Sequence, residues 1–95
     1  MIDEFEIGKF VTSSAGHDAG KCYVIIQIEN EYVYLVDGKI RTLSHPKKKK
    51  RIHVKMLAVS DQALTDKIVT HKVKNEEIKR AIKLLQNGNS SKEAM

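Results

Sequence analysis

The residues best suited to chemistry lie in a short loop rich in small residues, Ser14-Ala15-Gly16-His17-Asp18-Ala19-Gly20-Lys21. Gly16 and Gly20 permit a positive φ or a very close approach of another molecule to the backbone. Between them, Asp18 can accept a hydrogen bond from the backbone two residues further on and stiffen the turn. The amides of such a loop can face a phosphate, with Lys21 beside them. The loop therefore predicts a phosphate-binding turn, and an ordinary glycine-containing β-loop is the alternative.

This loop differs from the phosphate-binding loop of nucleotide hydrolases, which needs four residues between its glycines and a Ser or Thr after its lysine. No Ser-His-Asp, Cys-His or paired-carboxylate motif is evident elsewhere in the chain. The single cysteine and four histidines do not match the spacing of a common zinc site. We therefore expect no enzymatic activity and no metal or other cofactor, and we interpret Cys22 as a small buried hydrophobic residue.

Positive charge is concentrated in residues 39–55, which contain no Asp or Glu, whereas residues 1–38 are mainly acidic. The candidate RNA-contacting side chains of this block are Lys39, Arg41, Lys47, Lys48, Lys49, Lys50, Arg51, His53 and Lys55. A one-sided basic surface attracts polyanions and binds phosphates with release of counterions. Solubilising charge usually mixes the two signs, and this block does not. The charge pattern therefore favours RNA as the partner.

The Lys47–Arg51 run follows Pro46 and is predicted to be a flexible loop that grips phosphates. Adjacent ammonium groups repel one another, and an RNA backbone relieves that repulsion. A solvated loop and a nuclear import signal are the alternatives. RNA is the preferred interpretation because the basic residues after the run extend the same surface.

Tyr32 and Tyr34 share one face of a predicted strand. They are either a stacking platform for an unpaired base or part of the packing, covering the barrel or lying beneath a helix. Packing is the preferred interpretation, because aromatic residues are few and the core needs bulk.

Five short strands are predicted in the first half of the chain. They are Lys9–Thr12, Lys21–Glu29, Tyr32–Val36, Lys39–Leu43 running back after an Asp37-Gly38 hairpin turn, and the alternating residues 51–56. In the last two strands the basic residues alternate with Ile40, Ile52 and Val54, which places the apolar set inside and the basic set outside. A small barrel is the expected architecture, because closure removes exposed sheet edges.

The last third of the chain has helical periodicity. Asp61–Val69 is a short candidate helix, and Asn75–Gln86 is a second one, with Asn75 as its N-cap and Asn87-Gly88 as its stop. The apolar stripe of the second helix consists of Ile78, Ala81, Ile82 and Leu85. This stripe is expected to cover the barrel, and docking on a partner protein is the alternative.

The segment Gly8–Ile25, with the loop described above, resembles a KOW motif. More closely, it resembles the opening of the "fourteen-e" family of large-subunit ribosomal proteins of archaea and eukaryotes, and the short KOW-domain proteins of Gram-positive bacteria. The resemblance continues through Leu35-Val36-Asp37-Gly38 and the basic stretch to Ile52-His53, and it covers most of residues 7–86. It implies a mainly β fold, namely a small SH3-like (KOW) barrel with a C-terminal helical tail. The expected divisions are a barrel over residues 1–58, a helical extension packed on it over 59–88, and a disordered tail over 89–95.

The resemblance also implies a ribosomal or ribosome-associated protein of translation. Such a protein would grip structured ribosomal RNA of the large subunit and contact neighbouring ribosomal proteins. Its loop contacts would come from Ser14, Gly16, His17, Asp18, Gly20 and Lys21. The alternatives are an SH3-like protein-interaction module and a nuclear basic protein. A cytoplasmic location is expected because Cys22 is the only cysteine and allows no internal disulfide. No membrane association is expected, because no apolar run approaches the roughly 18 residues that a spanning helix needs, and the acidic N-terminus argues against a presequence.

Overall fold

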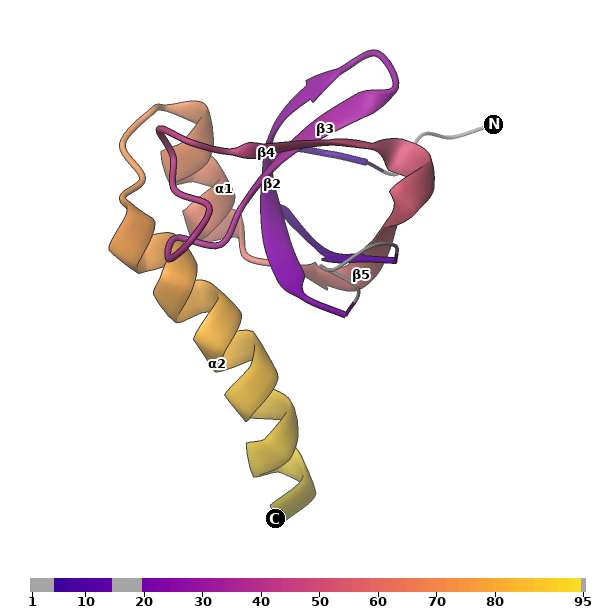
Figure 1. The fold of residues 1–95 in the computed structure, drawn as a ribbon. Coiled ribbons are helices and arrows are strands. Elements are labelled where there is room, and N and C mark those ends of the chain that lie inside the picture. The colour runs from indigo at the N-terminus through magenta and orange to yellow at the C-terminus, as the bar shows by residue number, and fades with distance from the viewer. Residues whose placement is uncertain (1–4, 15–19, 95) are drawn as a thin grey trace.

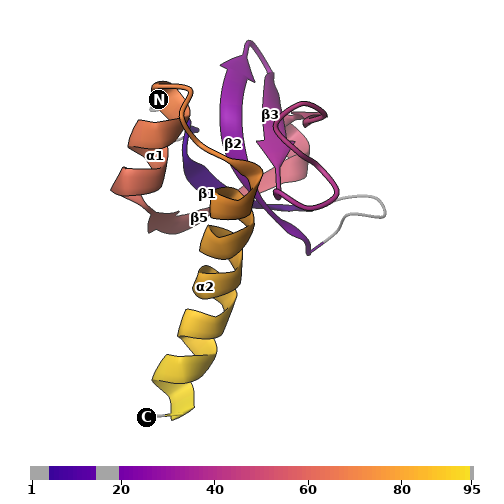
Figure 2. The ribbon, with the colours of Figure 1, turned by 90° about the vertical axis from the view of Figure 1, so that its left-hand side faces the viewer.

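The structure is a computed structural model that describes residues 5–14 and 20–94, with the backbone alone for Ala58, Ser60 and 87–94. Its elements are β1 (Lys9–Ser13), β2 (Cys22–Glu29), β3 (Tyr32–Val36), β4 (Lys47–Lys50), the 3₁₀ turn η2 (Arg51–His53), β5 (Val54–Ser60), α1 (Gln62–Val69) and α2 (Asn75–Ala94). The strands form one antiparallel sheet in the order β4-β3-β2-β1-β5. The sheet curls into a half-barrel, and both helices lie on one side of it (Figures 1 and 2). The fold is therefore mainly β, a small barrel with a C-terminal helical tail, which confirms the predicted class.

The centre of the sheet is buried on both faces, so the first four residues of β2, Cys22–Ile25, are all buried, whereas the rest of the strand is not. Inside the curl, one cluster is formed by Val11, Tyr23, Ile25, Val33, Leu35 and Val54. On the outer face, a second cluster joins the sheet to the helices and contains Phe10, Cys22, Val24, Val36, Leu64, Ile68, Ile78 and Ile82. Burial of apolar area on this scale is the main stabilising contribution in a small domain. The outer cluster fixes α2 against β2 and β3.

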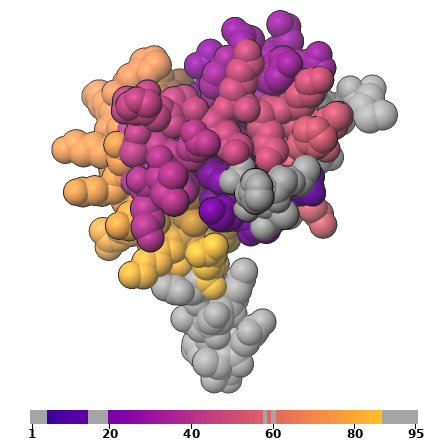
Figure 3. Space-filling model, viewed as in Figure 1, coloured from indigo at the N-terminus to yellow at the C-terminus, as the bar shows by residue number. Residues whose placement is uncertain are grey.

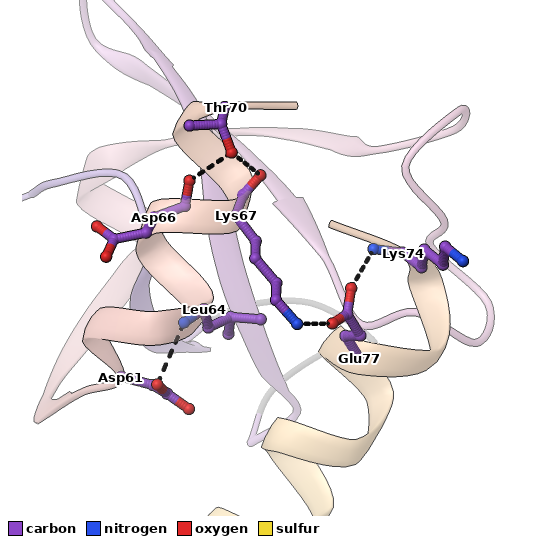
Figure 4. Close-up of polar contacts among 7 residues, drawn as sticks. All are labelled: Asp61, Leu64, Asp66, Lys67, Thr70, Lys74 and Glu77. Atoms are coloured by element: carbon purple, nitrogen blue, oxygen red, sulfur yellow. Dashed lines mark hydrogen bonds and ion pairs between the residues drawn. The ribbon is translucent and has the colours of Figure 1, made fainter. Parts of the chain in front are cut away.

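Polar contacts fix the junction between the two helices (Figure 4). The Asp61 carboxylate accepts a hydrogen bond from the Leu64 amide at 3.2 Å and caps α1. The Glu77 carboxylate accepts the Lys74 amide at 2.9 Å and also pairs with the Lys67 ammonium group of α1. The hydrogen bond from Lys67, followed by that from the Lys74 backbone, lowers the pKa of Glu77. Glu77 therefore links the start of α2 to α1.

Two predictions about α2 are wrong. Asn75 is the first helical residue rather than the cap, and its side-chain oxygen accepts a hydrogen bond from the Leu43 amide at 2.7 Å. The helix also passes through Asn87 and Gly88 and continues to Ala94. One glycine inside a helix costs only about 1 kcal/mol, which is too little to end the helix by itself.

Three strand predictions are wrong as well. The strand expected over residues 51–56 begins only at Val54, because Arg51–His53 forms a 3₁₀ turn. Residues 39–43 form a turn instead of a strand, and Lys47–Lys50 forms the strand that pairs with β3 instead of a loop. Ile40 and Ile52, expected inside the barrel, are 69% and 79% exposed. Residues 39–43 fail to form a strand for a local reason. The Asp37 side chain accepts hydrogen bonds from the backbone amides that a strand would offer to a neighbouring strand.

Candidate nucleic-acid interface

The ends of the glycine-containing loop are held together by a short hairpin ladder. The Gly20 amide donates to the Ser13 carbonyl at 2.8 Å, and the Ser13 amide donates to the Lys21 carbonyl at 3.1 Å. Gly20 has a φ of 87°, which is one of the two uses predicted for this glycine, and no described residue other than its chain neighbours lies within 4 Å of a Cβ built there. Lys21 is exposed beside it. Gly16, His17 and Asp18 lie outside the described residues, and the bracing role of Asp18 stays a prediction.

Ser14 connects this loop to the last basic segment of the chain. Ser14 is exposed, and its backbone amide donates a hydrogen bond to the His53 carbonyl at 2.9 Å. His53 and Lys55 are exposed as well, whereas Arg51 is half-buried and its guanidinium lies 5.6 Å from the Phe5 ring centroid. The Arg51 side chain is thus partly used in packing, while His53 and Lys55 are accessible.

Asp37 organises a tight turn next to the loop. One of its carboxylate oxygens accepts hydrogen bonds from the amides of Lys39, Ile40 and Arg41 at 2.8–3.0 Å. The Arg41 carbonyl in turn accepts the amides of Asp37 and Gly38. Lys39 is exposed on this turn and Arg41 is half-buried. Three backbone donors on one oxygen hold the Asp37 side chain in the turn.

A groove of about 540 Å³ is lined by three segments. They are the end of the glycine-containing loop, called here the Gly20 turn, the turn that Asp37 organises, called the Asp37 turn, and α2. Its charged lining residues are Lys21, Lys39, Lys79, Lys83 and Asp37. All four lysines are exposed residues that bring cations to one place from three segments distant in sequence. The segment after β3 lies beside the start of α2 on the face seen in Figure 3. We call the groove that Lys21, Lys39, Lys79 and Lys83 line the basic groove.

Lys79 and Lys83 were not among the predicted site residues. Their spacing of four places both on one face of a helix, adjacent in sequence to the buried Ile78 and Ile82. That spacing was visible in the sequence. The sequence could not indicate that this helix face lines the same groove as Lys21 and Lys39.

The lysines of β4 divide between two faces of the sheet. Lys48 and Lys50 lie opposite Tyr34 and Tyr32 and are exposed. Lys47 and Lys49 lie opposite Leu35 and Val33, whose side chains point into the curl, and both are half-buried. The Lys49 ammonium group donates to the buried Ser13 hydroxyl at 2.6 Å. The run is therefore an edge strand with two outward cations, and not four equivalent flexible ones.

Tyr32 and Tyr34 lie half-buried on the outer face of β3 and belong to neither core cluster. The Lys48 ammonium group is 4.5 Å from the Tyr32 ring centroid and 5.9 Å from that of Tyr34. The Tyr34 hydroxyl donates to the Glu29 carboxylate at 3.0 Å. The two rings are thus outside the cluster that α2 covers.

Cys22 is buried, as predicted, and burial raises the pKa of its thiol. Within residues 5–14 and 20–94, no group of three His, Cys, Asp or Glu side chains is placed to hold a metal ion. No helix in that same part of the chain is long and apolar enough to cross a membrane.

The site has the character of an anion-binding surface: several exposed cations, a groove open to solvent and an accessible backbone turn. No protein-family model matches the chain, and no curated protein matches it at a significant level.

Proposed function

We propose that this protein binds structured RNA, with the basic groove and the outward lysines of β4 contacting the phosphate backbone. The observation that carries the proposal is the convergence of Lys21, Lys39, Lys79 and Lys83 on one groove. Four lysines against the single carboxylate of Asp37 make the lining positive, which attracts phosphates, and phosphate binding releases counterions. RNA offers phosphates at the regular spacing that such a surface can follow.

The Gly20 turn adds a contact that depends on the backbone. Among the described residues, and apart from its two chain neighbours, nothing lies within 4 Å of a Cβ built at Gly20, so a phosphate has room to approach on that side. Contacts of this kind position a nucleic acid without reading its bases. We infer that the turn orients the RNA and that the lysines supply much of the affinity.

The ribosome is the proposed setting, and ribosomal RNA of the large subunit is the proposed ligand. The support is the resemblance of the Gly8–Ile25 segment to KOW-type ribosomal proteins, together with a small barrel followed by a helical tail. Co-sedimentation with large subunits in high salt tests this setting, because a stoichiometric subunit protein stays bound. Loss of the protein from the subunits in high salt would instead indicate a loosely associated factor.

The groove is tested by replacing Lys79 and Lys83 with Ser. We expect weaker binding to all structured RNAs, and a plot of log affinity against log salt that is flatter by about two counterions. The melting temperature should be unchanged, because both side chains are exposed. The measurement is filter binding to a ribosomal RNA fragment over a range of salt concentrations.

The matched control is Lys72→Ser with Lys74→Ser, which removes the same charge from the exposed connection between α1 and α2. This control should leave the salt dependence close to that of the unmodified protein. If both double variants weaken binding equally, net charge and not the groove determines affinity. If the unmodified protein binds no RNA at low salt, the proposed function is wrong.

The two faces of β4 give a second test. Lys48→Ser with Lys50→Ser should flatten the salt dependence by about two counterions and leave stability unchanged. Lys49→Ser should instead lower stability by about 1–3 kcal/mol, because it removes a charged donor from the buried Ser13 hydroxyl. Thermal melting and filter binding of both variants separate these effects. Equal losses of affinity per lysine on the two faces would contradict the assignment.

A further inference from the structure

We propose that the outer face of β3 and β4 is a stacking platform for an unpaired nucleotide, formed by Tyr32, Tyr34 and Lys48. This inference rests on the proposed function and specifies the class of RNA that this part of the surface takes. The ligand is a single-stranded segment, a bulge or a loop, because a base inside a duplex has no free face to stack.

The first support is that α2 covers only one end of this face. Val36 lies on the same side of β3 as the two tyrosines, is fully buried and belongs to the cluster beneath α2. Tyr32 and Tyr34 stay half-buried and outside both clusters. The face therefore changes from fully buried to partly exposed along a single strand, and its partly exposed end carries two aromatic rings.

The second support is the arrangement of charge around the rings. The Lys48 ammonium group lies within 6 Å of both ring centroids, where a cation is attracted by the ring faces. Lys50 lies opposite Tyr32 on the same face. A nucleotide presents a flat base joined to a phosphate, so its base can stack on a ring while Lys48 or Lys50 neutralises its phosphate.

The platform also has a direction. Glu29 lies opposite Tyr32 on β2 and accepts the Tyr34 hydroxyl, so the β2 side of the rings is negative. The β4 side carries the lysines. Phosphates should therefore run along β4, with the bases pointing across the rings toward Glu29.

Tyrosine fluorescence tests the platform in the unmodified protein. The chain has three tyrosines and no tryptophan, and Tyr23 is only 3% exposed in the inner cluster. A change in emission on adding ligand therefore reports mainly on Tyr32 and Tyr34. We expect a short oligouridylate to quench this emission, after correction for absorbance, and a duplex of oligouridylate with oligoadenylate of the same length to leave it unchanged.

Variants then test the contribution to affinity. Tyr32→Ala with Tyr34→Ala should bind the oligouridylate at least about tenfold more weakly, because stacking contributes strongly for each base. Tyr32→Phe with Tyr34→Phe keeps both rings and should bind within about twofold of the unmodified protein. Duplex affinity should be the same for all three proteins, and circular dichroism melting shows whether the alanine variant is folded.

The outcomes separate this inference from the proposed function. If neither RNA binds the unmodified protein, the proposed function is wrong and the platform falls with it. If both RNAs bind while the tyrosine emission and the alanine variant are unaffected, the platform is wrong and the proposed function stands. If a proline-rich peptide quenches the emission and oligouridylate does not, the face is a peptide-binding surface, and the inference is overturned.

Discussion

Gly38→Ala is expected to destabilise the protein by about 3 kcal/mol or more. A Cβ at Gly38 would lie 2.2 Å from the Asn75 carbonyl oxygen and 2.7 Å from the Lys79 amide nitrogen. Both atoms belong to the backbone of α2, which cannot yield locally without lifting the helix from the sheet. The φ of 79° at Gly38 adds strain for any residue with a side chain. In a domain of this size the melting temperature should fall by more than about 10 °C.

Gly20→Ala is the matched control for this effect. Gly20 has a similar φ of 87°, but among the described residues nothing other than its chain neighbours lies within 4 Å of a Cβ built there. Only the conformational strain remains, and a loss of about 1 kcal/mol is expected. Calorimetric or circular dichroism melting of both variants measures the difference. Equal melting temperatures for the two variants would mean that α2 does not pack against the Asp37 turn as described.

Ile78→Ala should have the second large effect, a loss of about 2–5 kcal/mol. Ile78 is fully buried in the outer cluster, which also contains Val36 and Leu64. The substitution leaves a cavity at the place where α2 meets the sheet. Because α2 carries Lys79 and Lys83, the affinity of the basic groove for RNA should also fall when the helix packs less well on the sheet.

Leu84→Ala on the same helix provides the comparison. Leu84 is also aliphatic and large, but it is 60% exposed, so its removal should change stability by about 0.5 kcal/mol or less. Urea denaturation of the two variants gives the difference in unfolding free energy directly. A small loss for Ile78→Ala, comparable to that of Leu84→Ala, would contradict the packing of α2 on the barrel.

The strands with strong local signals were predictable from the sequence. Tyr32–Val36 is found as β3 with the predicted bounds, and β2 begins one residue after the predicted start. These segments are rich in β-branched and aromatic residues, and turn residues bound them. Leu64 and Ile68 are likewise buried on one side of α1, as their spacing of four predicts.

The predictions that failed concern segments whose structure depends on contacts distant in sequence or on a side chain that competes for the backbone amides. Lysine has a low strand propensity, so Lys47–Lys50 read as a loop, although β3 provides a partner strand and the curl accommodates two of the four side chains. Residues 39–43 have an alternating pattern, but Asp37 binds their amides and prevents pairing. Periodicity carries no information on either effect.

The candidate site shows the same limit. Lys21 was predicted from the glycine-containing loop and Lys39 from the basic block of residues 39–55, and both line the basic groove. Lys79 and Lys83 were visible only as the polar side of a helix, because the groove is created when the outer cluster docks that helix beside the two turns. The inward position of Lys49 likewise depends on strand register, which composition does not reveal.

The strand order has a consequence for how the chain is made. β2, β3 and their connecting turn at Asn30 can form a hairpin on their own, on a timescale of about 1–10 μs. β1 pairs on its other side with β5, through partners such as Ser13 and Val54 that are roughly 40 residues apart, so this pairing closes a long loop and is slow. During synthesis, β1 therefore has one neighbour until β5 has left the exit tunnel. In that interval its open edge is where strand mispairing or a chaperone would act.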